Sequence, residues 1–123
     1  MTARRPPPLV WLLAGLCLAP TPGDVGGCGE PARDLDPTVF FLSKRGIECQ
    51  RCDECGIRSA ACEQACGDGA IPDDFPAGCF PLVHDGTVCL RAITQSSCAA
   101  HRRAMGAPPL VPGECNFCPP AGD

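Results

Sequence analysis

The sequence predicts a small disulfide-rich module of irregular α+β structure, with one or two short helices and a short strand or hairpin. Twelve of the 123 residues are cysteine, whereas aromatic residues make up only 5% of the chain. The chain also holds 15 prolines and 14 glycines, which favour turns and loops over long regular elements. A chain of this size with so few bulky apolar residues normally needs covalent cross-links to stay folded.

The segment 1–27 has the features of an export signal. Arg4 and Arg5 precede an apolar run from Leu9 to Ala19. That run is about half as long as a membrane-spanning helix, so we expect a cleaved signal peptide rather than a membrane anchor. We expect three further parts, which are a polar tether, a cysteine-rich module and a short tail (28–37, 38–118 and 119–123).

The position of signal cleavage decides how many cysteines remain in the mature chain. Cleavage after Ala19 removes Cys17 and leaves an odd number. Cleavage before Cys28, which follows the small-residue run 25–27, leaves ten thiols if a lipid is attached to Cys28. Lipid attachment at Cys28 is therefore our prediction. Two alternatives stay open, because Cys28 can instead pair between chains or remain free.

Few regular elements are expected between the tether and the middle of the module. Val39–Leu42 is a compact apolar run that predicts a strand, with its two phenylalanines on opposite faces. Ser59 predicts the N-cap of a short helix that extends to Gly67. The prolines and glycines of residues 68–78 predict a loop.

The segment Phe80–Ile93 has two interpretations. Asp85-Gly86 between apolar flanks is typical of a β-hairpin turn. Alternatively, Thr87 caps a helix that runs from Val88 to about Arg103 and stops before the following glycine and prolines. We favour the helix because the segment has both a start signal and a stop signal.

We expect the cysteines of the module to form five disulfides, because export brings the chain into an oxidising compartment. The sequence does not determine which cysteines pair with each other. The cysteines in question are Cys49, Cys52, Cys55, Cys62, Cys66, Cys79, Cys89, Cys98, Cys115 and Cys118.

Two metal sites are alternatives to the disulfides. Cys52 and Cys55 together with Cys115 and Cys118 have the paired spacing of a zinc ribbon. Cys49, Cys52 and Cys55, followed by Cys118 and a proline, have the ligand order of a bacterial iron–sulfur ferredoxin. We favour disulfides for all ten cysteines and expect no metal or other cofactor.

The sequence shows no catalytic constellation. His84 precedes a predicted turn, and we interpret His101, beside Arg102 and Arg103, as part of a solvated helix face. A Cys–His pair would need a free thiol, which a disulfide framework does not provide. The net charge of −4 without a basic stripe disfavours a nucleic-acid partner. We therefore expect a protein that is not an enzyme.

Three segments resemble small cysteine-rich cell-envelope lipoproteins of soil bacteria. They are the junction Val25–Cys28, the segment Cys89–Cys98 and the closing segment Pro112–Pro119. This resemblance implies a location at the cell envelope rather than an activity. The cysteine spacing from Cys49 to Cys66 also resembles that of von Willebrand factor type C modules, which are extracellular.

We therefore expect an exported, non-catalytic binding or structural module at the cell surface. It would be lipid-anchored or extracellular, would touch a membrane only through the lipid on Cys28, and would bind a protein or another envelope component. An alternative function is inhibition of an extracellular protease by the loop 73–77, which lies between Cys66 and Cys79.

Overall fold

A computed structural model of the chain describes residues 31–118, and its compact unit begins at Ala32. The expected signal peptide, the lipidation residue Cys28 and the tail 119–123 lie outside the described residues. The module contains four α-helices and one short 3-10 helix, which are α2 (Pro37–Glu54), α3 (Ala60–Cys66), α4 (Val83–Gln95), α5 (Cys98–Ala104) and η1 (Gly113–Cys115).

The predicted α+β class is wrong, because the module is helical. Within residues 31–118 the only β-type pairing is an isolated bridge between Asp34 and Leu82. The disulfide-rich character, by contrast, is confirmed by five disulfides. None of the helices described is both long enough and apolar enough to cross a membrane.

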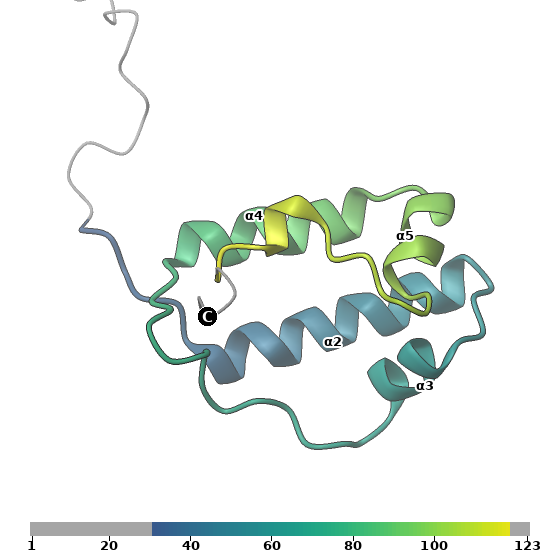
Figure 1. Cartoon of the computed structure of the whole chain (residues 1–123), viewed down its shortest axis with the longest axis horizontal. Helices are drawn as coiled ribbons and strands as arrows, with labels where there is room; N and C mark the ends of the chain where they lie inside the picture. The colour runs from purple at the N-terminus through teal and green to yellow at the C-terminus, as the bar shows by residue number, and fades with distance from the viewer. Residues whose placement is uncertain (1–30, 119–123) are drawn as a thin grey trace, which may run out of the picture. The chain divides into compact units, whose positions relative to one another are not determined.

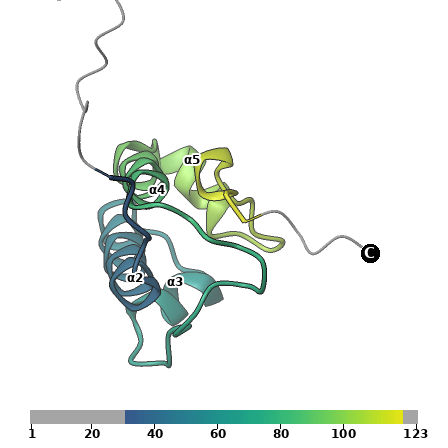
Figure 2. The same cartoon turned by 90° about the vertical axis from the view of Figure 1, so that its left-hand side faces the viewer.

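The helices follow the same order twice along the chain. The long helix α2 is followed by the short helix α3, and the long helix α4 is followed by the short helix α5 (Figure 1). α2 and α4 run in the same direction, and an irregular segment returns after each short helix (Figure 1). In Figure 2, the loop 67–79 and the C-terminal segment 106–118 project on the same side of α2 and α4.

The predicted strand Val39–Leu42 lies inside α2. Asp36 is the N-cap of this helix, and its Oδ1 accepts a hydrogen bond from Val39 N at 2.9 Å. Pro37 occupies the first turn, where a fixed φ and a missing N–H favour the start of a helix. The two phenylalanines consequently do not face opposite ways, since the ring centroids of Phe40 and Phe41 are 5.2 Å apart.

The described part of the expected tether is bound to the module. Leu35 N donates to Pro81 O at 2.9 Å, and Val83 N donates to Arg33 O at 2.9 Å. Residues 33–35 therefore lie along the segment that leads into α4.

The helix predicted from Ser59 is confirmed. Ser59 Oγ accepts a hydrogen bond from Cys62 N at 3.2 Å, and α3 ends at Cys66 with Gly67 as its C-cap. The loop predicted for residues 68–78 is also confirmed, since no helix or strand occurs there.

The hairpin alternative at Asp85-Gly86 is wrong, because both residues lie in α4. The Asp85 carboxylate accepts a hydrogen bond from Leu82 N at 2.8 Å and so stabilises the first turn of α4. Gly86 is buried against Leu35, and a Cβ at position 86 would lie 2.7 Å from the methyl carbons of Leu35. The glycine therefore allows close packing rather than a tight turn.

The favoured helix from Val88 to Arg103 is correct in type but wrong in its bounds. α4 begins five residues earlier, at Val83, and Thr87 is not its cap because Thr87 Oγ1 donates to Val83 O at 2.8 Å. The chain leaves the helical conformation at Ser96, and Ser97 then caps α5 by accepting a hydrogen bond from Ala100 N at 3.1 Å. Two adjacent serines thus divide the predicted helix into two.

The core formed by residues 31–118 consists of two clusters, and each contains disulfide-bonded cysteines. The first cluster joins α2 to α3 and comprises Cys52, Ile57, Cys62, Ala65 and Met105. The second joins α2 to α4 around the buried residues Phe40, Cys89 and Ile93. Three further phenylalanines pack against this second cluster, and these are Phe41, Phe75 and Phe117.

The five disulfides form two nested pairs and one bridge between them. The first nested pair joins α2 to α3, and the second joins α4 and the loop before it to the C-terminal segment. The remaining bridge, Cys55–Cys98, joins the end of α2 to the start of α5 and spans 43 residues. The nested pairs are Cys49–Cys66 with Cys52–Cys62, and Cys79–Cys118 with Cys89–Cys115.

Candidate binding groove

The described module contains an open groove with a volume of about 850 Å³. Sites for small organic ligands typically have volumes of about 300–1,000 Å³. Residues of α2, α3, α4 and α5 line the groove, and the segments 69–72 and 109–114, the second of which ends in η1, complete its walls. These two segments are the ones that project on the same side of the long helices (Figure 2).

Most of the groove lining is apolar. Ala65, Ile93 and Met105 are buried residues of the two core clusters that also face the groove. Leu110 and Val111, on the C-terminal segment, remain 62% and 59% exposed. Small side chains make up much of the rest of the lining, namely Ala61, Ala70, Ala92, Ala100 and Ala104.

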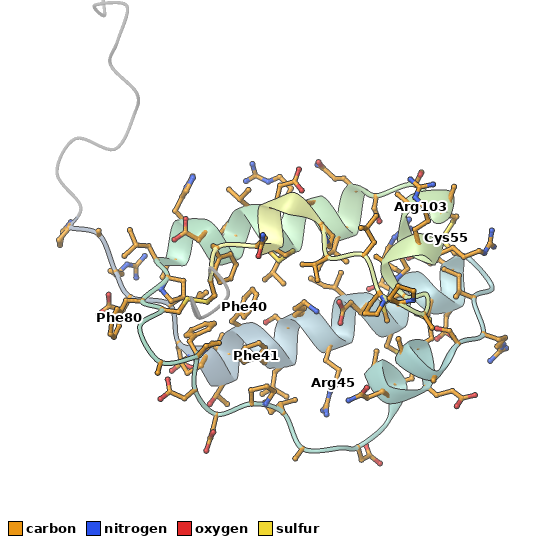
Figure 3. The ribbon with its side chains drawn as sticks, viewed as in Figure 1. Phe40, Phe41, Arg45, Cys55, Phe80 and Arg103 are labelled. Carbon is orange, nitrogen blue, oxygen red and sulfur yellow. A yellow bond between two sulfur atoms is a disulfide. The ribbon has the colours of Figure 1, made fainter. Side chains whose placement is uncertain are left out.

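The groove also carries charged side chains, and they differ in their partners. Lys44 Nζ and Glu48 Oε1 form an ion pair at 2.5 Å along one face of α2. Arg45 extends from α2 towards the loop 67–79, where its Nη1 donates to Gly69 O at 2.5 Å (Figure 3). Among the described residues, neither Arg103 on α5 nor Glu114 has an ion-pair partner.

The interpretation of His101 as solvated is wrong. Its side chain lies in the floor of the groove and is only 2% exposed. His101 Nε2 is 3.4 Å from Glu48 O and 3.8 Å from Cys52 Sγ. That sulfur belongs to the disulfide Cys52–Cys62, so this contact is not a Cys–His pair with a free thiol. These two contacts place His101 on the face of α5 that packs against α2, which explains its burial.

The structure does not bring together the four cysteines of the zinc alternative. Cys52, Cys55, Cys115 and Cys118 are each bonded to a different cysteine, and so are the cysteines of the iron–sulfur alternative. Cys49, Asp53 and Cys66 lie close enough together to suggest metal ligands. However, Cys49 and Cys66 form a disulfide, and the metal-binding form of cysteine is the thiolate.

The loop considered for protease inhibition is anchored by an aromatic side chain. Phe75 is half-buried, and its ring centroid lies 5.9 Å from that of Phe40 and 5.3 Å from that of Phe41. Asp73 and Asp74 on the same loop are exposed. Pro76 and Ala77 are exposed as well, so every residue of the loop except Phe75 is available to a partner.

Arg51 is a structural residue that the sequence analysis did not single out. Its guanidinium donates to Ser96 O, at the end of α4, and its Nη1 donates to Glu54 Oε2 at 2.5 Å. The side-chain hydrogen bonds from Gln50 and Arg51 lower the pKa of Glu54 below its usual value. Arg51 therefore links α2 to the break between α4 and α5.

No protein-family model, curated protein or solved structure matches this chain. The groove also has no signature in the sequence, because its lining residues are spread from Phe41 to Glu114 and only folding brings them together. The sequence does contain the helix caps that orient the lining helices, such as Asp36 and Ser97. From these caps the start of the helices that line the groove could have been predicted.

Proposed function

We propose that this chain is an exported, non-catalytic binding module of the cell envelope, that the groove is its binding site, and that Cys28 carries a lipid anchor. The observation that supports this proposal is the cross-linking of the groove walls. The walls outside the long helices α2 and α4 are α3, α5 and the segments 69–72 and 109–114. α3 and α5 are joined to α2 by disulfides, and each of the two segments lies within a few residues of a cysteine that is bonded to α2 or α4.

The cross-links act on different walls. α3 is joined to α2 by Cys49–Cys66 and Cys52–Cys62, and α5 is joined to α2 by Cys55–Cys98. The C-terminal wall 109–114 is followed at once by Cys115, which is bonded to Cys89 in α4. A groove whose walls are fixed before binding loses little conformational entropy when a ligand binds. Stable disulfides also favour an oxidising, exported location.

Blocking the groove tests its role in binding. Ala100 lines the groove, whereas the adjacent Ala99 is exposed and does not line it. We expect native mass spectrometry of the protein from its own host to show a bound mass with the wild type and with Ala99→Phe. The same mass should be absent with Ala100→Phe. Circular dichroism would establish that both variants remain helical. A bound mass that persists with folded Ala100→Phe would contradict the proposal.

The anchor is tested by the intact mass of the protein from the host envelope. We expect a chain that begins at Cys28, carries acyl groups, and gains ten hydrogens when the five disulfides are reduced. Substitution of Cys28 by serine should move the protein from the detergent phase to the aqueous phase in a phase-separation assay. An unlipidated mass that begins elsewhere would refute the anchor and leave the groove test unaffected.

A further inference from the structure

We infer that the ligand of the groove is a single-chain amphiphile with an anionic headgroup, of which a fatty acid is the simplest example. This inference rests on the proposed function of the groove as a binding site and specifies the chemistry of the ligand. It follows from three properties of the described groove, which are its apolar lining, its lack of a sheet edge, and two guanidinium groups that form no ion pair.

The lining matches a hydrocarbon chain. Ile93 and Met105 form part of the floor, and Leu110 and Val111 remain largely exposed on one wall. Exposed apolar side chains gathered in a hollow gain free energy when an apolar ligand removes them from water. Alanines between the larger residues leave room for a thin chain along the groove.

The described groove lacks the sheet edge to which an extended peptide usually adds. Peptides that bind in extended form usually add a strand to an exposed sheet edge, and the described residues contain no strand. In the C-terminal wall, Pro109 and Pro112 have no N–H, and Leu110 N already donates to Arg103 O at 3.3 Å. In the opposite wall, Gly69 O accepts from Arg45. A hydrocarbon chain needs no such partners, so the groove favours it over a peptide.

The charges of the groove favour an anion. The Lys44–Glu48 pair is neutral as a unit, which leaves the guanidinium groups of Arg45 and Arg103 and the carboxylate of Glu114. The groove is thus locally positive, although the whole chain has a net charge of −4. A guanidinium group has five N–H donors, and the bond to Gly69 O uses one of those of Arg45. Carboxylates and phosphates are the anions that a guanidinium group binds best.

Titration calorimetry with ligands of one chain length tests the inference. Laurate and dodecyl phosphate supply the two headgroups, and dodecyltrimethylammonium supplies the same chain with a positive charge. We expect laurate, below its micelle concentration, to bind once per protein in the micromolar range. Dodecyl phosphate should bind at least as well, and the cationic amphiphile at least about tenfold more weakly. Equal affinity for the cationic and anionic amphiphiles would overturn the inference.

Single substitutions identify the groups that hold the anion. Arg45→Gln and Arg103→Gln should each weaken laurate binding about three- to tenfold, and the double variant should reduce it to the level of the cationic amphiphile. Arg102→Gln is the matched control, because Arg102 is exposed, adjacent to Arg103 and not part of the groove lining. The same loss of affinity with Arg102→Gln would show a general charge effect and would overturn the assignment.

The outcomes separate this inference from the proposed function. Laurate that fails to bind, while Ala100→Phe still removes the mass bound in the host, would refute the amphiphile and leave the binding groove standing. Binding of hexaglutamate in preference to laurate, again abolished by Ala100→Phe, would identify a peptide-binding groove instead. Several laurate molecules bound with no effect of Ala100→Phe would place the binding outside the groove and overturn the inference.

Discussion

Removal of the bridge Cys55–Cys98 should destabilise the module more than removal of any bridge of the nested pairs. The reason lies in the unfolded chain, where a disulfide lowers the conformational entropy in proportion to the logarithm of the loop that it closes. Each nested bridge has a companion that already keeps its two ends close together. Cys55–Cys98 has none, because it alone joins α2 to α5.

The loss of unfolding free energy depends on the number of residues in the loop that each bridge closes. With the other four bridges intact, that loop follows the shortest path along the chain and across those bridges. For Cys55 and Cys98 the shortest route is about 32 residues, which corresponds to about 4 kcal/mol of unfolding free energy at 25 °C. For Cys49 and Cys66 the route through Cys52–Cys62 is about 7 residues, which corresponds to about 2.4 kcal/mol.

The double variants Cys55→Ala/Cys98→Ala and Cys49→Ala/Cys66→Ala form a matched pair. In both bridges one cysteine is half-buried and the other is exposed, so the change in packing is similar. Guanidinium unfolding followed by far-ultraviolet circular dichroism measures both free energies. We expect the Cys55/Cys98 variant to be less stable than the Cys49/Cys66 variant by about 1–1.5 kcal/mol. Equal losses, or a larger loss for Cys49/Cys66, would refute the argument from loop length.

The remaining predictions use the same unfolding assay. Gly46→Ala should raise the unfolding free energy by about 0.5–1 kcal/mol, because Gly46 lies within α2 and a Cβ there has no neighbour within 4 Å. Gly86→Ala makes the same change in α4 but should lower stability by about 1–2 kcal/mol, because its Cβ meets Leu35; a gain in stability would contradict this packing. Phe40→Ala should cost about 3–5 kcal/mol, since Phe40 is only 4% exposed. Phe80→Ala, which removes a ring that is 85% exposed and projects from the module (Figure 3), should change stability by less than about 0.5 kcal/mol, and a larger change would mean that the ring is buried.

The sequence was sufficient to predict the elements whose local signals agree with each other. Ser59 as a cap and Gly67 as a stop gave α3 its correct bounds, and the Pro- and Gly-rich segment 68–78 is a loop. All ten cysteines expected in disulfides are paired in the described part of the chain. Their pairing was beyond reach, because it depends on which helices pack together rather than on spacing along the chain.

The errors arose where one local signal has two physical meanings. A short apolar run is compatible with a strand or with a buried helix segment, and at Val39–Leu42 the preceding Asp36-Pro37 should have decided for the helix. An Asp-Gly pair is typical of a hairpin turn. In α4, however, the Asp85 carboxylate accepts a hydrogen bond from Leu82 N at the start of the helix, and Gly86 leaves room for the side chain of Leu35. The contact with Leu35 is tertiary, and no property of residues 85 and 86 alone reveals it.

The arrangement of the bridges has a consequence for the survival of the module among proteases. The loop 67–78 lies between the two nested pairs, and most of its residues are exposed. A single cut in this loop would leave two fragments, each with its own two disulfides, that remain joined through Cys55–Cys98. The cut protein would migrate as one species until it is reduced and would then separate into two. The same cut would open one wall of the groove, so a single species under non-reducing conditions does not guarantee an intact binding site.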